Sequence, residues 1–146
     1  MRALLLAAAL LLAGPVQAQF SVLPAPQVKG TPRASEATTD DEYKVDAARH
    51  LYSAYPQRIF KGVLPPFIYS VMVVQTEIDE QGQVRDVAVL RTPAADEVAP
   101  WVIAMVRRAG PYPAPAKMAG GARWVEIFLV DKGGKFQVDT LTEGQR

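Results

Sequence analysis

The sequence predicts an α+β fold in which two helices pack against an antiparallel sheet of three to four strands. Two segments have apolar residues at helical spacing, four segments are rich in β-branched and aromatic residues, and a tight turn joins the first two of those four. The elements follow the order helix, strand, strand, helix, strand and short strand (α-β-β-α-β-β). Helices that gather against an antiparallel sheet are typical of α+β domains.

The first 18 of the 146 residues have the three-part plan of a secretory signal peptide. Arg2 supplies the positive start, a run of Ala and Leu fills residues 3–13, and Val16-Gln17-Ala18 places small residues at a cleavage site. The alternative is an uncleaved membrane anchor. Because this run would span only about 16 Å as a helix, against a hydrocarbon core of about 30 Å, we expect cleavage after Ala18 and export.

Residues 19–38 contain Pro24, Pro26 and Pro32 and show no sustained hydrophobic period. Such a segment offers too little apolar surface to offset the entropy of ordering it, so we predict a flexible linker. One domain follows over residues 39–140, and residues 141–146 are expected to form a frayed tail. No later stretch is long and apolar enough to span a bilayer, so no stable membrane insertion is expected after cleavage.

The domain begins with a predicted helix over residues 39–55. Thr39-Asp40-Asp41-Glu42 has the spacing of a capping box, which satisfies backbone N–H groups at a helix start. Pro56 ends the helix, because a proline disfavours helical conformation in the residue before it. We interpret the three acids as helix-capping residues and not as a metal site.

Residues 67–78 and 83–91 predict an antiparallel hairpin around the turn Asp79-Glu80-Gln81-Gly82. The first segment, FIYSVMVVQTEI, is apolar on both faces, so we expect both sides of this strand to be covered, at least in its first half. If its second face is open instead, that face would favour self-association.

A second amphipathic helix is predicted within residues 92–108. Its apolar stripe follows helical spacing and is interpreted as core: Val98, Trp101, Val102, Met105 and Val106. Residues 122–130 (ARWVEIFLV) then predict a strand. After a Gly-Gly turn, residues 135–140 (KFQVDT) predict a short final strand.

The composition excludes most enzyme chemistry. The chain has no Cys and one His, which removes thiolate nucleophiles, Cys-based zinc sites and His-rich metal sites. Its net charge of +1 gives no electrostatic reason for a nucleic-acid partner. His50 with Ser53 lacks a nucleophile motif, and the carboxylates of Glu77, Asp79 and Glu80 belong to a hairpin tip. We therefore predict a non-enzymatic protein without a cofactor or metal.

The order of elements and several local motifs resemble the C-terminal domain of TonB-type energy transducers. Tyr55-Pro56 is similar to the family's Tyr-Pro before its first core strand, and residues 74–89 (VQTEIDEQGQVRDVAV) resemble its hairpin with an Asp-x-x-Gly turn. The start of the second helix at Asp96-Glu97, residues 111–115 (PYPAP) and the strand 122–130 resemble the elements that follow.

This resemblance, which extends over residues 41–140, implies a periplasmic TonB-like domain of a Gram-negative bacterium. It also implies a protein partner, such as a short segment of an outer-membrane receptor that adds as a strand to the sheet edge. The corresponding edge is the short last strand: Phe136, Gln137, Val138 and Asp139.

Three alternatives to this reading stay open. The cleavable start and the short spacer depart from the family and argue against energy transduction; an anchored transducer is the alternative if the start is retained. A homodimer is the second alternative. The third is an envelope structural protein of the same fold with an unrelated partner.

Overall fold

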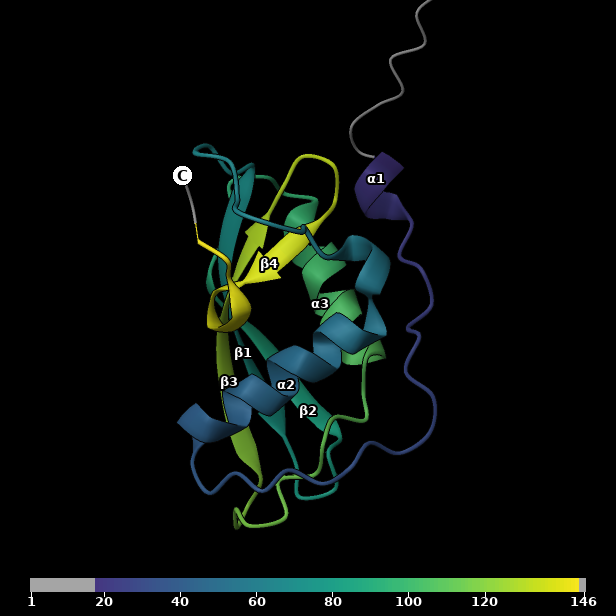
Figure 1. The fold of residues 1–146 in the computed structure, drawn as a ribbon, viewed down its shortest axis with the longest axis vertical. Coiled ribbons are helices and arrows are strands. Elements are labelled where there is room, and N and C mark those ends of the chain that lie inside the picture. Colours follow the sequence, from purple (N-terminus) through teal and green to yellow (C-terminus); the bar gives the residue numbers. More distant parts are fainter. Residues whose placement is uncertain (1–17, 145–146) are drawn as a thin grey trace, which may run out of the picture.

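The computed structural model describes residues 18–144 and has the predicted α+β class (Figure 1). Four strands form one antiparallel sheet in the order β2-β1-β3-β4. They are β1 (Ser70–Ile78), β2 (Val84–Arg91), β3 (Ala122–Val130) and β4 (Phe136–Val138). The helices are α1 (Ala18–Ser21), α2 (Asp40–Ala54) and α3 (Val98–Arg108), with 3-10 turns at Pro56–Arg58 and Asp139–Leu141. Of the predicted signal peptide, residues 1–17 lie outside the described residues.

Helix α2 starts where the capping residues predict. The Glu42 N–H donates to the Thr39 hydroxyl at 3.2 Å, and the Glu42 carboxylate accepts from the Thr38 N–H at 2.7 Å. The return bond goes to Thr38 and not to Thr39, yet it closes the same first turn. The helix ends at Ala54, just before the residue that precedes Pro56. The prediction of this helix is confirmed.

Helix α3 is also confirmed, with its start moved to Val98. Pro100 lies in the first turn, where its missing N–H costs no bond. The whole predicted stripe is buried. Strand β3 has the predicted bounds, whereas β1 begins at Ser70 because pairing with β3 starts there. Phe67 lies before the first paired residue and is 92% exposed.

Strand β1 lies at the centre of the sheet. Its pairing with β3 is unbroken, from Ser70 opposite Val130 to Ile78 opposite Ala122. Its pairing with β2 is irregular at both ends. Leu90 is an extra residue between the pairs Val74–Val89 and Val73–Arg91, and Arg85 is an extra residue between Glu77–Asp86 and Ile78–Val84. Such bulges bend a strand and increase its twist.

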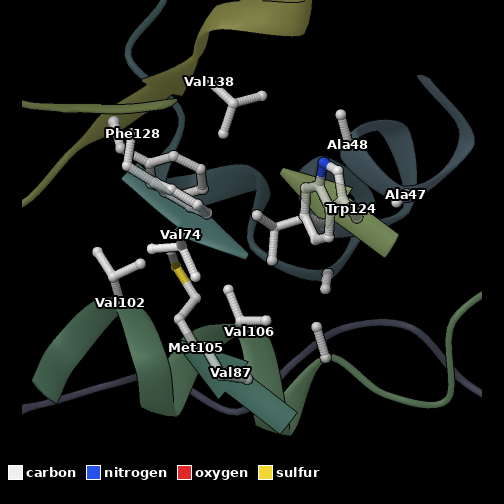
Figure 2. Packing of buried hydrophobic residues seen from close by; sticks show 14 of the residues in the cluster. Ala47, Ala48, Val74, Val87, Val102, Met105, Val106, Trp124, Phe128 and Val138 are labelled. Carbon is white, nitrogen blue, oxygen red and sulfur yellow. The ribbon is translucent and has the colours of Figure 1, made fainter. Parts of the chain in front are cut away.

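Helices α2 and α3 pack on the same face of the sheet (Figure 1). Figure 2 shows this core, in which side chains of β1 and β3 meet those of the two helices: Val74, Trp124 and Phe128 with Ala47, Ala48, Val102, Met105 and Val106. Along β1 the residues that face this core are buried, and those between them are half-buried until Glu77.

The prediction that both sides of β1 are covered, at least in its first half, is met only in part: Val71 and Val73 are half-buried, and no helix within residues 18–144 lies on that second face. Val71 and Val73 are partly shielded there by cross-strand neighbours, Leu129 and Ile127. Apolar side chains on the helix-free face bury part of one another's surface. A strand can therefore be apolar on both faces although helices pack on only one of them.

Residues 19–38 lie along the domain, unlike the loose linker that the composition predicts. Phe20 is 7% exposed, stacks on Tyr69 at 6.0 Å and meets Trp101 edge-on at 5.4 Å. The ring of Phe20 buries apolar surface that holds this segment on the domain, and the average composition of the segment does not show this. Further bonds fasten the segment to the domain: Gln27 N–H to the Ala54 carbonyl, Ser35 N–H to the Ala114 carbonyl, and the Ser35 hydroxyl to the Asp46 carboxylate. Among residues 18–144, no helix has the length and hydropathy needed to cross a bilayer.

Candidate interaction edges of the sheet

The sheet has two edge strands, β4 and β2. The sequence places the interaction site on β4, at Phe136 to Asp139. The structure confirms that β4 is an edge strand but buries three of these four residues: Phe136, Gln137 and Val138 are at most 1% exposed. Asp139 is exposed and opens the 3-10 turn that follows.

The outer side of β4 is already paired within the chain. The Phe60 N–H donates to the Phe136 carbonyl at 2.9 Å, in a parallel bridge between Ile59 and Phe136. The Val138 N–H donates to the Tyr52 hydroxyl at 3.0 Å. A strand added here would have to displace these partners, so this edge is closed in the described fold.

Gln137 holds this closure together. Its amide nitrogen donates to the Phe60 and Gly62 carbonyls at 2.8 and 2.7 Å. Its amide oxygen accepts from the Thr142 hydroxyl at 2.9 Å and the Glu143 N–H at 3.2 Å. This buried amide makes all its hydrogen bonds and joins β4 to the distant residues 60–62 and to the nearby residues 142–143. The structure thus gives this predicted contact residue a structural role.

A buried carboxylate supports the chain just after β4. Glu126, 3% exposed, accepts from the Ile127 and Thr140 N–H groups and from the Trp124 indole N–H, at 3.1 to 3.3 Å. Burial raises the pKa of this carboxyl, and the hydrogen bonds partly oppose that rise. Its hydrogen bond to the Thr140 N–H holds the chain in place directly after β4.

The outer side of β2 is open. Only β1 pairs with this strand, and no backbone hydrogen bond within residues 18–144 joins residues 85–91 to anything outside the sheet. At the hairpin end the neighbouring chain comes close, with the Tyr112 N–H donating to the Gly82 carbonyl at 2.8 Å. The open stretch therefore runs from Asp86 to Arg91. Alternate residues of an edge strand leave N–H and C=O groups without a ladder partner.

The open edge has a charged residue at each end and four apolar residues between them. Asp86 lies 3.9 Å from the Arg107 guanidinium, with both side chains about half exposed. Arg91 is exposed and forms no ion pair with a residue of 18–144. Between them, Val89 and Leu90 are 37% and 55% exposed. The β2 edge thus combines unpaired backbone, accessible apolar side chains and one unpaired cation.

Of the residues considered for catalysis, His50 and Ser53 lie on α2, whereas Glu77, Asp79 and Glu80 lie together at the hairpin tip. His50 is buried: its Nε2 lies 2.8 Å from the Ala109 carbonyl, and burial lowers its pKa. The Ser53 hydroxyl bonds to the Arg49 carbonyl of its own helix. Asp79 caps the hairpin turn through the Gln81 and Gln83 N–H groups and pairs with Arg85 at 3.0 Å.

Among several hollows on the surface of the described chain, two lie beside segments that are described above. One, of about 580 Å³, lies at the hairpin tip beside Glu77, Asp79 and Arg123. The other, of about 880 Å³, lies between residues 20–23 and helix α3. Within residues 18–144 no group of three or more His, Asp or Glu side chains is placed to hold a metal ion.

Comparison with models of protein families, with curated proteins and with solved structures found no match in any of the three.

Proposed function

We propose that this chain is a non-enzymatic interaction domain that binds an extended protein segment by strand addition at the β2 edge. The observation that carries the proposal is the unpaired outer side of residues 86–91, whereas the outer side of β4, at the opposite edge of the sheet, is filled. An added strand gains main-chain hydrogen bonds along such an edge and selects its partner through the side chains that flank it.

The proposed setting is the periplasm. The chain would reach it by export, with cleavage after Ala18 removing residues 1–18. The resemblance of the hairpin and closing strand to TonB C-terminal domains supports a protein segment as the ligand and an envelope process as the context. The proposal departs from that resemblance in the place of binding, which is β2 and not the last strand. Energy transduction is not part of it.

The test is photo-crosslinking in intact cells that export the chain, with one photoreactive residue per variant. Leu90 lies on the open edge and Asp139 at the end of the closed one, and both side chains are exposed, so the two variants are matched. We expect a protein adduct from position 90 and none from position 139. An adduct from position 139 alone, or none from either position, would overturn the proposal.

A further inference from the structure

We infer that the strand added to the β2 edge is β2 of a second copy, related by a two-fold axis that places Ala88 opposite Ala88. The inference rests on the proposed function of this edge and names its partner. It joins two sheets of four strands into one continuous antiparallel sheet of about twice the width.

The faces of the two strands agree in this register. Asp86, Ala88 and Arg91 pair with Glu77, Gln75 and Val73, which alternate along β1, so all three lie on the second face of the sheet. Asp86 and Arg91 share that face only because Leu90 is an extra residue between them. Two residues before the axis in one copy, Asp86 therefore meets the Leu90–Arg91 bulge of the other.

Charge complementarity favours the same register. Because of the bulge at Leu90, the carboxylate of Asp86 comes next to the guanidinium of Arg91 in the second copy, and symmetry repeats the pair. The same register brings Arg85 towards Arg91 of the second copy, but Arg85 is held by Asp79 of its own chain at 3.0 Å. Asp86 therefore gives Arg91 the partner that it lacks in one chain. A register centred on Val87 places Asp86 opposite Ala88, and one centred on Val89 places the Leu90–Arg91 bulge opposite Ala88. Neither alternative brings opposite charges together.

Apolar contacts accompany the pairing. Val87 of one copy lies opposite Val89 of the other, which covers the part of Val89 that is now exposed. Leu90, 55% exposed in one chain, comes to lie against the second strand. The second faces of both sheets then join into a single surface, with Ala88 of each copy at its centre and Gln75 of β1 on either side. Pairing at the edge thus also buries apolar surface, which adds to the main-chain bonds.

Disulfide trapping tests the register, because the chain has no cysteine of its own. Residues directly opposite in an antiparallel pair have Cβ atoms about 5 Å apart, within reach of a disulfide after small shifts. We expect Ala88→Cys to form a covalent dimer under mild oxidation. The matched control, Val63→Cys, is 43% exposed in a loop outside the sheet and should stay monomeric.

Charge reversal tests the pairing in solution. By light scattering over a concentration series, Arg91→Asp should weaken the dimer of the processed chain at least about tenfold, because both symmetric pairs become repulsive. Adding Asp86→Arg to the same chain restores opposite charges and should return most of the affinity. As a control, far-ultraviolet circular dichroism and urea unfolding are used to check that each variant is folded.

The outcomes separate this inference from the proposed function. Suppose that the chain is monomeric at all concentrations, that Ala88→Cys forms no dimer, and that position 90 crosslinks to a different protein. This result overturns the inference that the partner is a second copy, but it leaves the proposed strand addition intact. A dimer that forms equally well in the Arg91→Asp chain overturns the register. No crosslink from position 90 and no dimer overturn both proposals.

Discussion

The two edges of the sheet differ in what lies outside them. Beyond β4, residues 59–62 and the Tyr52 hydroxyl take up the outward backbone groups, and Gln137 joins them to residues 142–143. Beyond β2, no described residue takes that place between Asp86 and Arg91. The strand that is last in sequence is closed, and a strand in the middle of the chain is open.

This difference shows that position in the sequence does not decide which edge can receive a partner. The short β4 strand is protected by a distant loop and a buried amide. The longer β2 strand is protected only by a bulge at each end, which is a weaker device against pairing. The bulge at Leu90 also places the Arg91 side chain on the second face of the sheet. Asp86 of an added second copy lies on that same face.

The largest expected effect comes from opening the closed edge. Gln137→Ala leaves the Phe60 and Gly62 carbonyls without partners, so we expect a loss of about 3 kcal/mol in the free energy of unfolding, measured in urea. Gln75→Ala is the control, because Gln75 is half-buried on the same face of the sheet and its side chain forms no hydrogen bond within residues 18–144. Equal losses in the two variants would show that the β4 edge is not held by Gln137.

The next effect comes from the aromatic contacts behind the closed edge. Phe20 packs on Trp101, which in turn meets Phe136 of β4 edge-on at 6.1 Å. Phe20→Ala should cost about 2 kcal/mol of unfolding free energy, while Val22→Ala, at a residue 66% exposed, should cost almost nothing. A flexible linker over residues 19–38 predicts instead that both variants unfold like the parent chain.

A third prediction concerns pH. Because burial raises the pKa of Glu126, the folded chain binds a proton there more tightly than the unfolded chain, whose carboxyl keeps its ordinary value of 4.5. This group therefore adds stability as the pH falls from neutrality towards 4.5 and removes it as the pH rises. The unfolding free energy of the parent chain minus that of Glu126→Gln should grow over this fall in pH. A difference that shrinks would mean that the folded state prefers the carboxylate.

The smallest effect on stability is expected at the open edge. Leu90→Lys changes a side chain that is 55% exposed, so the free energy of unfolding should move by less than about 0.5 kcal/mol. The same variant should lose dimerisation, because a lysine on an edge strand opposes strand pairing. A marked loss of stability in the monomer would show that Leu90 belongs to the core and that the β2 edge is not free.

Local patterns in the sequence predicted the elements of this fold well. The capping residues at Thr39 and the apolar stripe of α3 are short-range signals, and the structure confirms both. The closure of β4 is not a short-range signal, because it depends on a bond between residues 77 apart in sequence, Gln137 and Phe60. A lone glutamine inside an apolar strand was the available hint, since a buried amide requires partners.

The open edge left a different kind of signal. The segment VRDVAVLR breaks its own alternation at Leu90, where the structure has a bulge. A broken alternation indicates irregular pairing, but the sequence does not specify which neighbour the strand keeps and which side stays empty. The order β2-β1-β3-β4 decides that, and it arises from packing across the whole domain.

Residue-resolved amide hydrogen exchange tests the contrast between the two edges most directly. It is measured on the Arg91→Asp chain, at a concentration at which light scattering finds only the monomer, so that the β2 edge is unpaired. We predict that alternate amides within residues 86–91 exchange rapidly, while the Val138 amide, bonded to the Tyr52 hydroxyl, exchanges only through large-scale unfolding. Slow exchange throughout residues 86–91 together with fast exchange at Val138 would contradict the account.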